Sequence, residues 1–346
     1  MWHRVVLALL FVLACRVAVS AAEPTKIDVF TADTDGYTVC RIPGLVVTAK
    51  GSLLAYCEAR RTNSDWGEID LLLRRSTDGG QTWSKPQKVG KLPRHIKRNV
   101  VAAEKKIGAS DKFTMNNPVA IADRDGSVHL LYCIEYARCF YVHSTDDGQS
   151  FSEPIEITAT FEKFQPNYAW KVLATGPGHG VQLKKGRLLV PVWLSPGTGG
   201  NAHHPSAVAT IFSDDHGQTW QHGAIVARNS EKFRDPSETA AVELSDGRVL
   251  LNMRNESLAN RRLIAISSDG ASNWSEPKFD DALLEPICMA SLARVNDKQI
   301  VFSNPANLLS KGKEGQPGRG RDRINLTVRL SSDDGQTWPL SRVLEP

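Results

Sequence analysis

Residues 76–83 read Ser-Thr-Asp-Gly-Gly-Gln-Thr-Trp, and this stretch decides the fold because the chain repeats it. The pattern is S-x-D-x-G-x-T-W, and further copies begin at Ser144, Ser213, Ser267 and Ser331, of which the copy at Ser267 is degraded. Successive copies start 68, 69, 54 and 64 residues apart. A repeat of that length is one supersecondary unit, and such units form radial arrays or solenoids.

The chemistry of the motif predicts a tight hairpin turn. Its Ser and Asp side chains can bond backbone N–H groups one or two residues further on. Its Gly tolerates a backbone conformation that other residues resist, and the Trp or Phe at its end can anchor the turn by burying a ring. The Asp-rich spelling could also suggest a calcium loop, but the acidic ligands are few and no acidic twelfth position recurs.

Apolar strands surround each copy of the motif. One strand lies directly before each copy, at residues 69–73, 139–142, 208–212, 263–266 and 326–330. Further upstream, a strand–turn–strand pattern with a Gly turn occurs around residues 49–52, 123–126, 184–187 and 245–248. Four strands per repeat make a propeller blade, so the sequence predicts an all-β propeller.

Composition agrees with one large β domain. The chain has 346 residues, of which 41% are hydrophobic. Its formal net charge is +4, from 42 Lys and Arg against 38 Asp and Glu, and removal of Arg4 and Arg16 with the leader described next leaves +2. This charge is too small to argue for a nucleic-acid partner.

The first 22 residues are predicted to be a secretory signal peptide, which leaves residues 23–346 as the propeller domain. They combine a weakly basic start, an apolar run and small residues at a candidate cleavage site. Because the apolar run is too short to span a bilayer, we expect a secreted or periplasmic protein without a membrane span. Cys15 leaves a lipoprotein anchor as the less favoured alternative.

Five cysteines remain without Cys15, and an odd number cannot all pair within the chain. Cys133 and Cys139 could bridge a hairpin or could be core thiols. The cysteine spacings do not match a zinc site, and we expect neither a metal nor a cofactor.

Several motifs follow one another in a revealing order. An Arg-Ile-Pro motif starts at Arg41, Gly-Pro-Gly-His occupies residues 176–179, Glu238 precedes an Asn-Met-Arg motif ending at Arg254, and Arg-Ile-Asn starts at Arg323. Together with the repeats, this order closely resembles the exo-α-sialidase (neuraminidase) family with Asp-box, or BNR, repeats. The resemblance covers nearly the whole chain and implies a six-bladed β-propeller that binds sialylated glycans.

The resemblance implies that Arg41, Arg254 and Arg323 grip the carboxylate of sialic acid. Arginine presents a fixed fork that suits a carboxylate, and three arginines around one point repel one another unless an anion lies there. The family pattern adds Arg60 as a substrate-binding residue and places Asn117 near the N-acetyl group. The alternatives are that each arginine pairs with a surface carboxylate, and that Asn117 is a turn residue before a proline.

The implied reaction is the hydrolysis of terminal sialic acids from glycoconjugates by a retaining mechanism. Asp65 matches the position of the acid/base, and Glu238 the residue that polarises a tyrosine nucleophile. A neutral tyrosine suits this role because the anomeric carbon carries a carboxylate, which repels an anionic nucleophile. Alternatively, Asp65 is a solvated loop carboxylate, and Glu238 is a pairing partner for Arg254.

One departure from the family concerns the nucleophile. The family's nucleophilic tyrosine lies in a last blade beyond the final Asp box, whereas Pro346 follows Trp338 by eight residues. Other tyrosines lie in the wrong repeats, namely Tyr136, Tyr141 and Tyr168. We therefore expect a six-bladed propeller whose last blade is largely missing here, with a strand at residues 27–30 belonging to that blade and with exposed strand edges.

Two other functions are compatible with these residues. A propeller without the tyrosine could bind sialic acid or another carbohydrate without cutting it. A propeller with the same arginines could also hydrolyse another acidic sugar.

Overall fold

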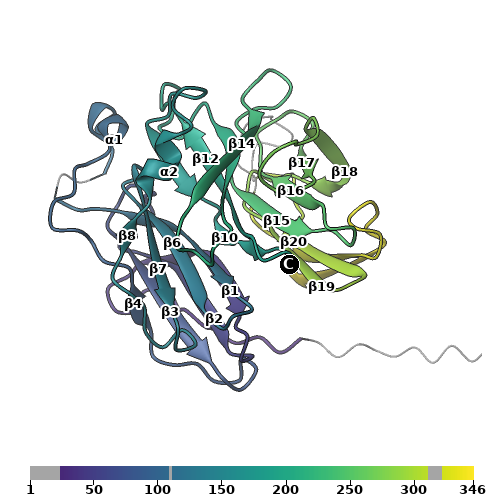
Figure 1. The fold of residues 1–346 in the computed structure, drawn as a ribbon, viewed down its shortest axis with the longest axis horizontal. Helices are drawn as coiled ribbons and strands as arrows, with labels where there is room; N and C mark the ends of the chain where they lie inside the picture. Colours follow the sequence, from purple (N-terminus) through teal and green to yellow (C-terminus); the bar gives the residue numbers. More distant parts are fainter. Residues whose placement is uncertain (1–23, 109–110, 311–321) are drawn as a thin grey trace, which may run out of the picture.

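Five sheets, one for each repeat and built mainly of antiparallel strands, follow one another around a common centre in chain order (Figure 1). The computed structural model describes residues 24–108, 111–310 and 322–346. The all-β propeller predicted from the repeats is confirmed with five blades among these residues, and a sixth blade is not confirmed. The predicted signal peptide lies outside the described residues.

The first sheet comprises β1 (Val39–Val47), β2 (Leu53–Arg60), β3 (Ile69–Ser76) and β4 (Gln87–Val89). The second comprises β5 (Met115–Ala122), β6 (Val128–Ile134), β7 (Arg138–Ser144) and β8 (Ile155–Glu156), with β10 (Gly178–His179) added in parallel to β5. The third comprises β9 (Val172–Thr175), β11 (Val181–Gln182), β12 (Leu188–Ser195), β13 (Ala207–Ser213) and β14 (Gln221–Arg228). The fourth comprises β15 (Thr239–Glu243), β16 (Val249–Met253), β17 (Arg261–Ser267) and β18 (Lys278–Leu284). The fifth comprises β19 (Ser291–Asn296), β20 (Gln299–Pro305), β21 (Leu326–Ser331) and β22 (Leu340–Glu345). The described residues also form two short helices, α1 (Val100–Glu104) and α2 (Thr158–Glu162).

Each Asp box joins the third and fourth principal strands of its sheet, as its sequence predicts. In the first copy, the Ser76 hydroxyl donates to Asp78 Oδ1 at 2.7 Å, and the Thr82 hydroxyl donates to Asp78 Oδ2 at 2.6 Å. The Gly80 N–H closes the turn on Ser76 Oγ at 2.9 Å. The box carboxylate is therefore satisfied by donors of its own turn, which supports the interpretation of the motif as a structural turn.

Neighbouring sheets pack face to face through apolar side chains. The cluster between the first and second sheets includes Leu54, Leu71 and Leu130, all fully buried. The glycine of the next Asp box comes very close to it: Gly148 has φ +78°, and an added Cβ would lie 2.5 Å from Leu54 Cδ1. Only glycine meets both the backbone conformation and the spacing at this point.

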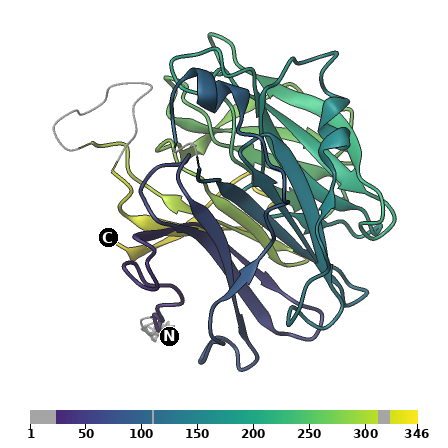
Figure 2. The same ribbon diagram turned by 90° about the vertical axis from the view of Figure 1, so that its left-hand side faces the viewer.

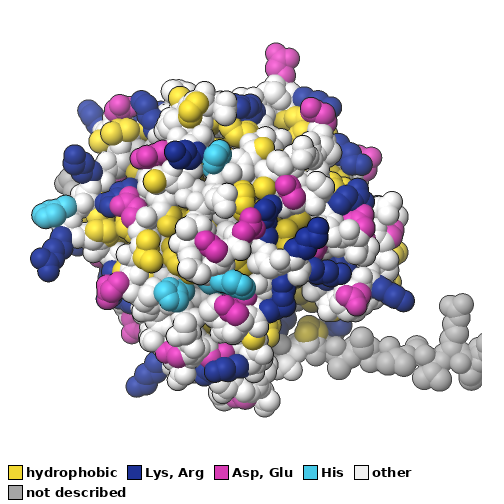
Figure 3. Space-filling view, viewed as in Figure 1, with side chains coloured by type: hydrophobic (Ala, Val, Ile, Leu, Met, Phe, Trp, Pro, Cys, Tyr) yellow, Lys and Arg dark blue, Asp and Glu magenta, His cyan; other side chains and the backbone are white. Residues whose placement is uncertain are grey.

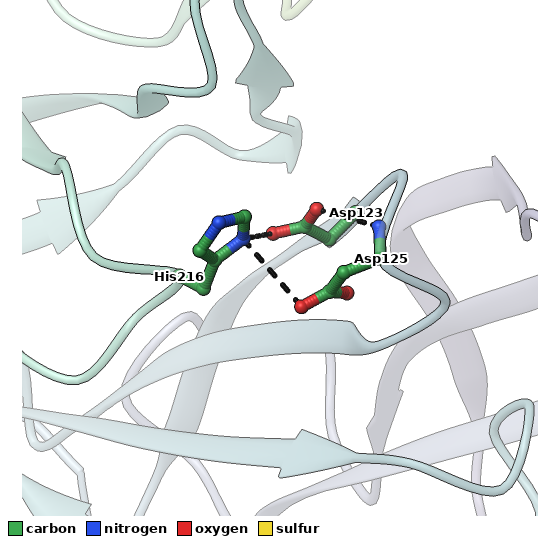
Figure 4. Close-up of side chains that lie close together, drawn as sticks. All are labelled: Asp123, Asp125 and His216. Carbon is green, nitrogen blue, oxygen red and sulfur yellow. Dashed lines mark hydrogen bonds and ion pairs between the residues drawn. The ribbon is translucent and has the colours of Figure 1, made fainter.

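In three of the Asp boxes, the residue directly before the glycine of the S-x-D-x-G motif contacts the preceding sheet. Asp147 accepts hydrogen bonds from Thr48 Oγ1 and from Ser52 Oγ (2.6 Å) in the first sheet. His216 Nδ1 lies 2.8 Å from Asp123 Oδ2 in the second sheet and 3.5 Å from Asp125 Oδ2, as Figure 4 shows. Asp334 likewise accepts from the Ser245 N–H of the fourth sheet, and it also accepts from Arg294 of its own sheet. These contacts fix the sheets relative to one another.

The first and fifth sheets lie beside each other across one sector of the ring (Figure 2). The strand expected at residues 27–30 does not form, because no strand pairs with this segment. Val29 and Phe30 instead line an apolar pocket between the first sheet and residues 289–291. Leu45 of β1 and Leu340 of β22 are more than half exposed.

Three further features bear on the sequence predictions. Within the described residues no helix has the length and apolarity needed to cross a membrane. Charged side chains of both signs are interspersed over the face in Figure 3, in line with the small net charge. Cys133 and Cys139 face each other on β6 and β7 as buried free thiols, so the hairpin disulfide is not formed.

Replacing Asp147 by Ala should lower the free energy of unfolding by about 3 kcal/mol, because it leaves the Arg75 guanidinium without its ion-pair partner. Burial opposes ionisation of Asp147, but hydrogen bonds from Ser52 and Thr48 and the Arg75 charge lower its pKa to about 2. The contribution of the carboxylate is therefore present above pH about 4 and is lost as the pH falls towards 2. Urea unfolding across this range measures both effects.

The matched control is Thr145→Ala in the same box, because Thr145 is exposed. Its free energy of unfolding should change by less than about 0.5 kcal/mol. Equal losses in the two variants would contradict the proposed role of Asp147 between sheets.

Candidate active site

A pocket of about 580 Å³ lies where the five sheets converge, since each sheet contributes residues to its wall. Contributors include Arg41 on β1, Asn117 on β5, Trp193 on β12, Arg254 next to β16 and Ser303 on β20. The first strands of neighbouring sheets contact one another around this point. Residues far apart in the sequence therefore meet in one cavity.

The structure brings all seven predicted site residues to this pocket: Arg41, Arg60, Asp65, Asn117, Glu238, Arg254 and Arg323. Arg41 lies on a first strand, as expected. Arg254 directly follows β16, and Arg323 precedes β21 by three residues, so neither lies within a strand. The placement agrees with the predicted site, while the role of each residue stays a prediction.

Arg60 links a buried carboxylate to the predicted acid. Its Nε donates to Glu58 Oε2 at 2.8 Å, and its Nη1 donates to Asp65 Oδ1 at 2.6 Å. Arg60 and Glu58 are almost inaccessible to solvent, whereas the Asp65 side chain is 46% exposed. The pair in the strand therefore holds Asp65 in place at the wall of the pocket.

Asp65 is ionised in the free site. Burial opposes ionisation, but the charge and hydrogen bond of Arg60 outweigh it, so the pKa of Asp65 is lowered. Arg41 adds to this effect with its Nη1 3.7 Å from Asp65 Oδ1. Asp65 is thus a loop carboxylate that is ion-paired with Arg60 and remains partly exposed to solvent.

Asn117 is held by the protein on three sides. Its backbone N–H donates to Glu58 Oε1 at 2.7 Å, and its Nδ2 donates to the Thr175 carbonyl at 3.1 Å. Its φ of 52° places it in the left-handed region, at a register shift in β5. Much of its hydrogen-bonding capacity is therefore used within the protein, which favours a structural part for this residue.

Glu238 pairs with Arg254, whose Nη1 donates to Glu238 Oε2 at 2.5 Å. Arg254 Nη2 also lies 3.8 Å from Glu256 Oε1, and His204 Nε2 lies 3.3 Å from the same oxygen. Burial opposes protonation of His204, but the Glu256 hydrogen bond outweighs it and raises the pKa of the imidazole. Glu238 is therefore an ion-pair partner of Arg254, as the alternative interpretation predicts, and it also lines the pocket.

Sequence reasoning missed an aromatic cluster in the pocket wall. Tyr136 packs against Trp66 and His203, each with its ring centroid 4.7 Å from that of Tyr136. Trp193 closes the cluster 5.2 Å from His203. By the family pattern Tyr136 lies in the wrong repeat for the nucleophile, and no sequence motif links these four residues. The one sequence signal for this cluster is that Trp66 directly follows Asp65, a predicted site residue.

These features define a propeller with a central pocket that combines arginines with carboxylates. The model of the BNR repeat-like domain family matches residues 96–346, and that of the BNR/Asp-box repeat matches residues 74–85. The chain therefore belongs to the BNR repeat family of sialidase-like proteins, as the sequence motifs predict.

Curated relatives agree with this family. The chain is 32% identical over 355 residues to a sialidase of Micromonospora viridifaciens, covering 93% of this chain and 48% of that protein. It is 31% identical over 329 residues to a sialidase of Bacteroides fragilis, covering 89% of this chain and 55% of that protein. The chain thus spans about half the length of these curated relatives.

Solved structures show the same fold. The Hadza microbial sialidase Hz136 matches with a TM-score of 0.71 and 26% identity, covering 90% of this chain and 60% of that chain. Trypanosoma rangeli sialidase in complex with the inhibitor DANA matches with a TM-score of 0.62 and 20% identity, covering 85% of this chain and 47% of that chain. At 20% identity, the second likeness supports the propeller fold alone.

Proposed function

We propose that this propeller carries the substrate-binding part of an exo-α-sialidase, which hydrolyses terminal sialic acids from glycoconjugates. The observation that carries the proposal is the meeting of Arg41, Arg254 and Arg323 in one pocket with Asp65. Arginine side chains suit the carboxylate of a sugar acid because their planar guanidinium groups can bind it through two hydrogen bonds. The names of the relatives support sialic acid as that sugar.

In the proposed reaction, Asp65 donates a proton to the oxygen of the leaving group and later accepts one from water. Arg60 fixes the position of Asp65, and the pocket arginines orient the substrate through its carboxylate. Glu238, held by Arg254, polarises a tyrosine that attacks the anomeric carbon in a retaining mechanism. Each step uses a side chain at the wall of the same cavity, apart from the tyrosine.

We further propose that the active propeller has a sixth blade between the first and fifth sheets and that this blade carries the tyrosine. Support comes from the exposed apolar side chains on β1 and β22 and from the apolar pocket lined by Phe30 and Met289. Exposed apolar surface on two facing sheets is the kind of surface that another sheet covers. The resemblance to six-bladed sialidases gives the number of blades.

A propeller that binds sialic acid without cutting it is the second candidate. It is favoured by one observation: Tyr136 is the only tyrosine among the described residues that line the pocket, and burial together with the charges of Glu58 and Asp65 raises its pKa well above the usual range. Such a hydroxyl is a poor nucleophile. Binding and turnover assays separate the two candidates.

Arg254→Ala should weaken the binding of DANA by about 1.5–3 kcal/mol, the usual range for hydrogen bonds to charged groups. Titration calorimetry on the wild type and the variant measures this loss. The matched control is Arg248→Ala, since Arg248 lies in the same sheet and pairs with Asp246 at the surface. A wild-type protein that does not bind DANA, or an Arg254→Ala variant that binds it normally, would refute the proposed function.

Asp65→Asn should slow the cleavage of sialosides with poor leaving groups by roughly 10²–10⁴-fold in a form of the protein that carries the sixth blade. Sialosides with good leaving groups should be affected less, because they need little protonation. Steady-state rates on one substrate of each kind give the comparison. Equal losses on both substrates would assign Asp65 a structural role instead.

Residues 23–346 alone should bind DANA but turn over an aryl sialoside slowly or not at all, because the covalent step needs the nucleophile. A form with the sixth blade should show turnover in the same assay. Fast hydrolysis by residues 23–346 would mean that another residue of this chain attacks the anomeric carbon, and the assignment to a sixth blade would be wrong.

A further inference from the structure

Tyr136 lines the pocket, and its hydroxyl has no hydrogen-bond partner among the described residues. The residue lines the pocket, yet its side chain and backbone together are only 3% exposed. Its backbone N–H and carbonyl are both bonded, whereas its hydroxyl donates to no described residue. Buried tyrosine hydroxyls usually find a partner. A free hydroxyl at the wall of a cavity is therefore a group that a ligand can satisfy.

The backbone of Tyr136 is fixed by three neighbouring elements. Its N–H donates to Asn116 Oδ1 on β5 at 3.3 Å. Its carbonyl accepts from the Leu173 N–H on β9 at 2.8 Å and from Asn99 Nδ2 before α1 at 3.2 Å. The position of the side chain is thus set by contacts that reach across two sheets.

The turn that carries Tyr136 is strained and supported. Glu135 and Tyr136 have φ of 56° and 49°, a left-handed conformation that is costly for residues other than glycine. The buried carboxylate of Glu135 stabilises the turn by accepting from the Thr114 N–H at 3.0 Å and the Asn99 N–H at 3.3 Å. Strain of this kind persists only where the surroundings over-determine the backbone, and it concentrates at ligand sites.

The ring of Tyr136 is held as firmly as its backbone. Trp66 and His203 each pack on it with ring centroids 4.7 Å away, and Trp193 lies at 6.1 Å. His203 and Trp193 line the pocket, and Trp66 packs in a buried cluster with Tyr136 and Trp193. The hydroxyl therefore points from a rigid ring, which lowers the entropic cost of a hydrogen bond to a ligand.

The surroundings keep the hydroxyl protonated. Burial raises the pKa of Tyr136, and the negative charges of Glu58 and Asp65 raise it further, against the opposing charge of Arg60. Glu238 acts in the same direction as the other carboxylates. The Tyr136 hydroxyl therefore keeps its proton at neutral pH and can donate a hydrogen bond there.

We propose that Tyr136 is a substrate-binding residue whose hydroxyl donates a hydrogen bond to an acceptor oxygen of the bound sugar acid, close to Asp65. This inference rests on the proposed function, because the ligand it assumes is the one that the pocket arginines bind. It assigns a binding role to a residue in the second sheet, which the motif pattern of the chain does not single out. The acceptor is a carbonyl, hydroxyl or ring oxygen of the sugar, and the donor is neutral.

Tyr136→Phe removes only this hydroxyl and keeps the ring in its aromatic cluster. The variant should bind DANA about 3- to 10-fold more weakly, as expected for the loss of one neutral hydrogen bond. The midpoint of thermal unfolding should change little, because no protein contact is lost. Titration calorimetry and a melting curve on the same preparation give both values.

Tyr141→Phe is the matched control. Tyr141 lies on β7 of the same sheet, and its hydroxyl lies 2.8 Å from His129 Nδ1. It does not line the pocket. This variant should therefore lose stability and keep the wild-type affinity for DANA, which is the reverse of the pattern expected for Tyr136→Phe.

A crystal structure of the wild type with DANA gives a second test that does not depend on a variant. The Tyr136 hydroxyl oxygen should lie within about 3.2 Å of an oxygen of the ligand. A separation above about 4 Å, or an unchanged affinity in Tyr136→Phe while Arg254→Ala weakens binding, would overturn the assignment of Tyr136 and leave the proposed function intact. A wild type that does not bind DANA would instead remove the proposed function on which the assignment rests.

Discussion

A side chain directly before the glycine of the Asp box ties one sheet of this propeller to the sheet before it. Asp147, His216 and Asp334 make this contact, and each reaches a turn of the preceding sheet. In the degraded box of the fourth sheet, Gly270 directly follows Asp269, so no residue stands between the aspartate and the glycine. There the third sheet supplies the contact instead, because Arg187 donates to the Asp269 carbonyl at 3.0 Å. The angle between sheets, and with it the meeting of their first strands, depends on these contacts.

Much of the fold and of the pocket could be predicted from the sequence because the deciding signals are local. The hydrogen bonds of each Asp box join residues within about five positions of one another, so the structure of the turn follows from its local sequence. Once the boxes fix the repeats, residues next to strands such as Arg41 and Arg254 are brought to the centre by the radial arrangement alone. The resemblance of a few short motifs to the sialidase family therefore predicts seven residues that line one cavity.

Other features depend on contacts that no local pattern records. Tyr136 meets Trp66 and His203 only because three loops from different sheets converge. The expected strand at residues 27–30 failed for a related reason, since a strand needs a partner strand and the described residues provide none there. An apolar segment can form a β-strand, but whether it does so depends on a partner strand that the tertiary structure places beside it.

Two buried ion pairs support the pocket from beneath. Arg60 is held by Glu58, and Arg262 of the fourth sheet is held by Glu285, with all four side chains at 1% exposure or less. Buried ion pairs are weak contributors to stability, because removing charges from water costs about as much as their attraction returns. Their contribution here is orientation, because Arg60 is held by Glu58 and donates a further hydrogen bond from Nη1 to Asp65.

The arginines that suit the pocket to an anion also hold Asp65 in the state least suited to an acid. Arg60 and Arg41 lower the pKa of Asp65 in the free site, whereas a general acid needs its proton. In the proposed reaction the substrate resolves this conflict, since its carboxylate neutralises Arg41 and brings a negative charge near Asp65. Both changes favour the protonated carboxyl group. In the proposed reaction, the substrate carboxylate that binds the arginines thus also favours the protonated form of Asp65.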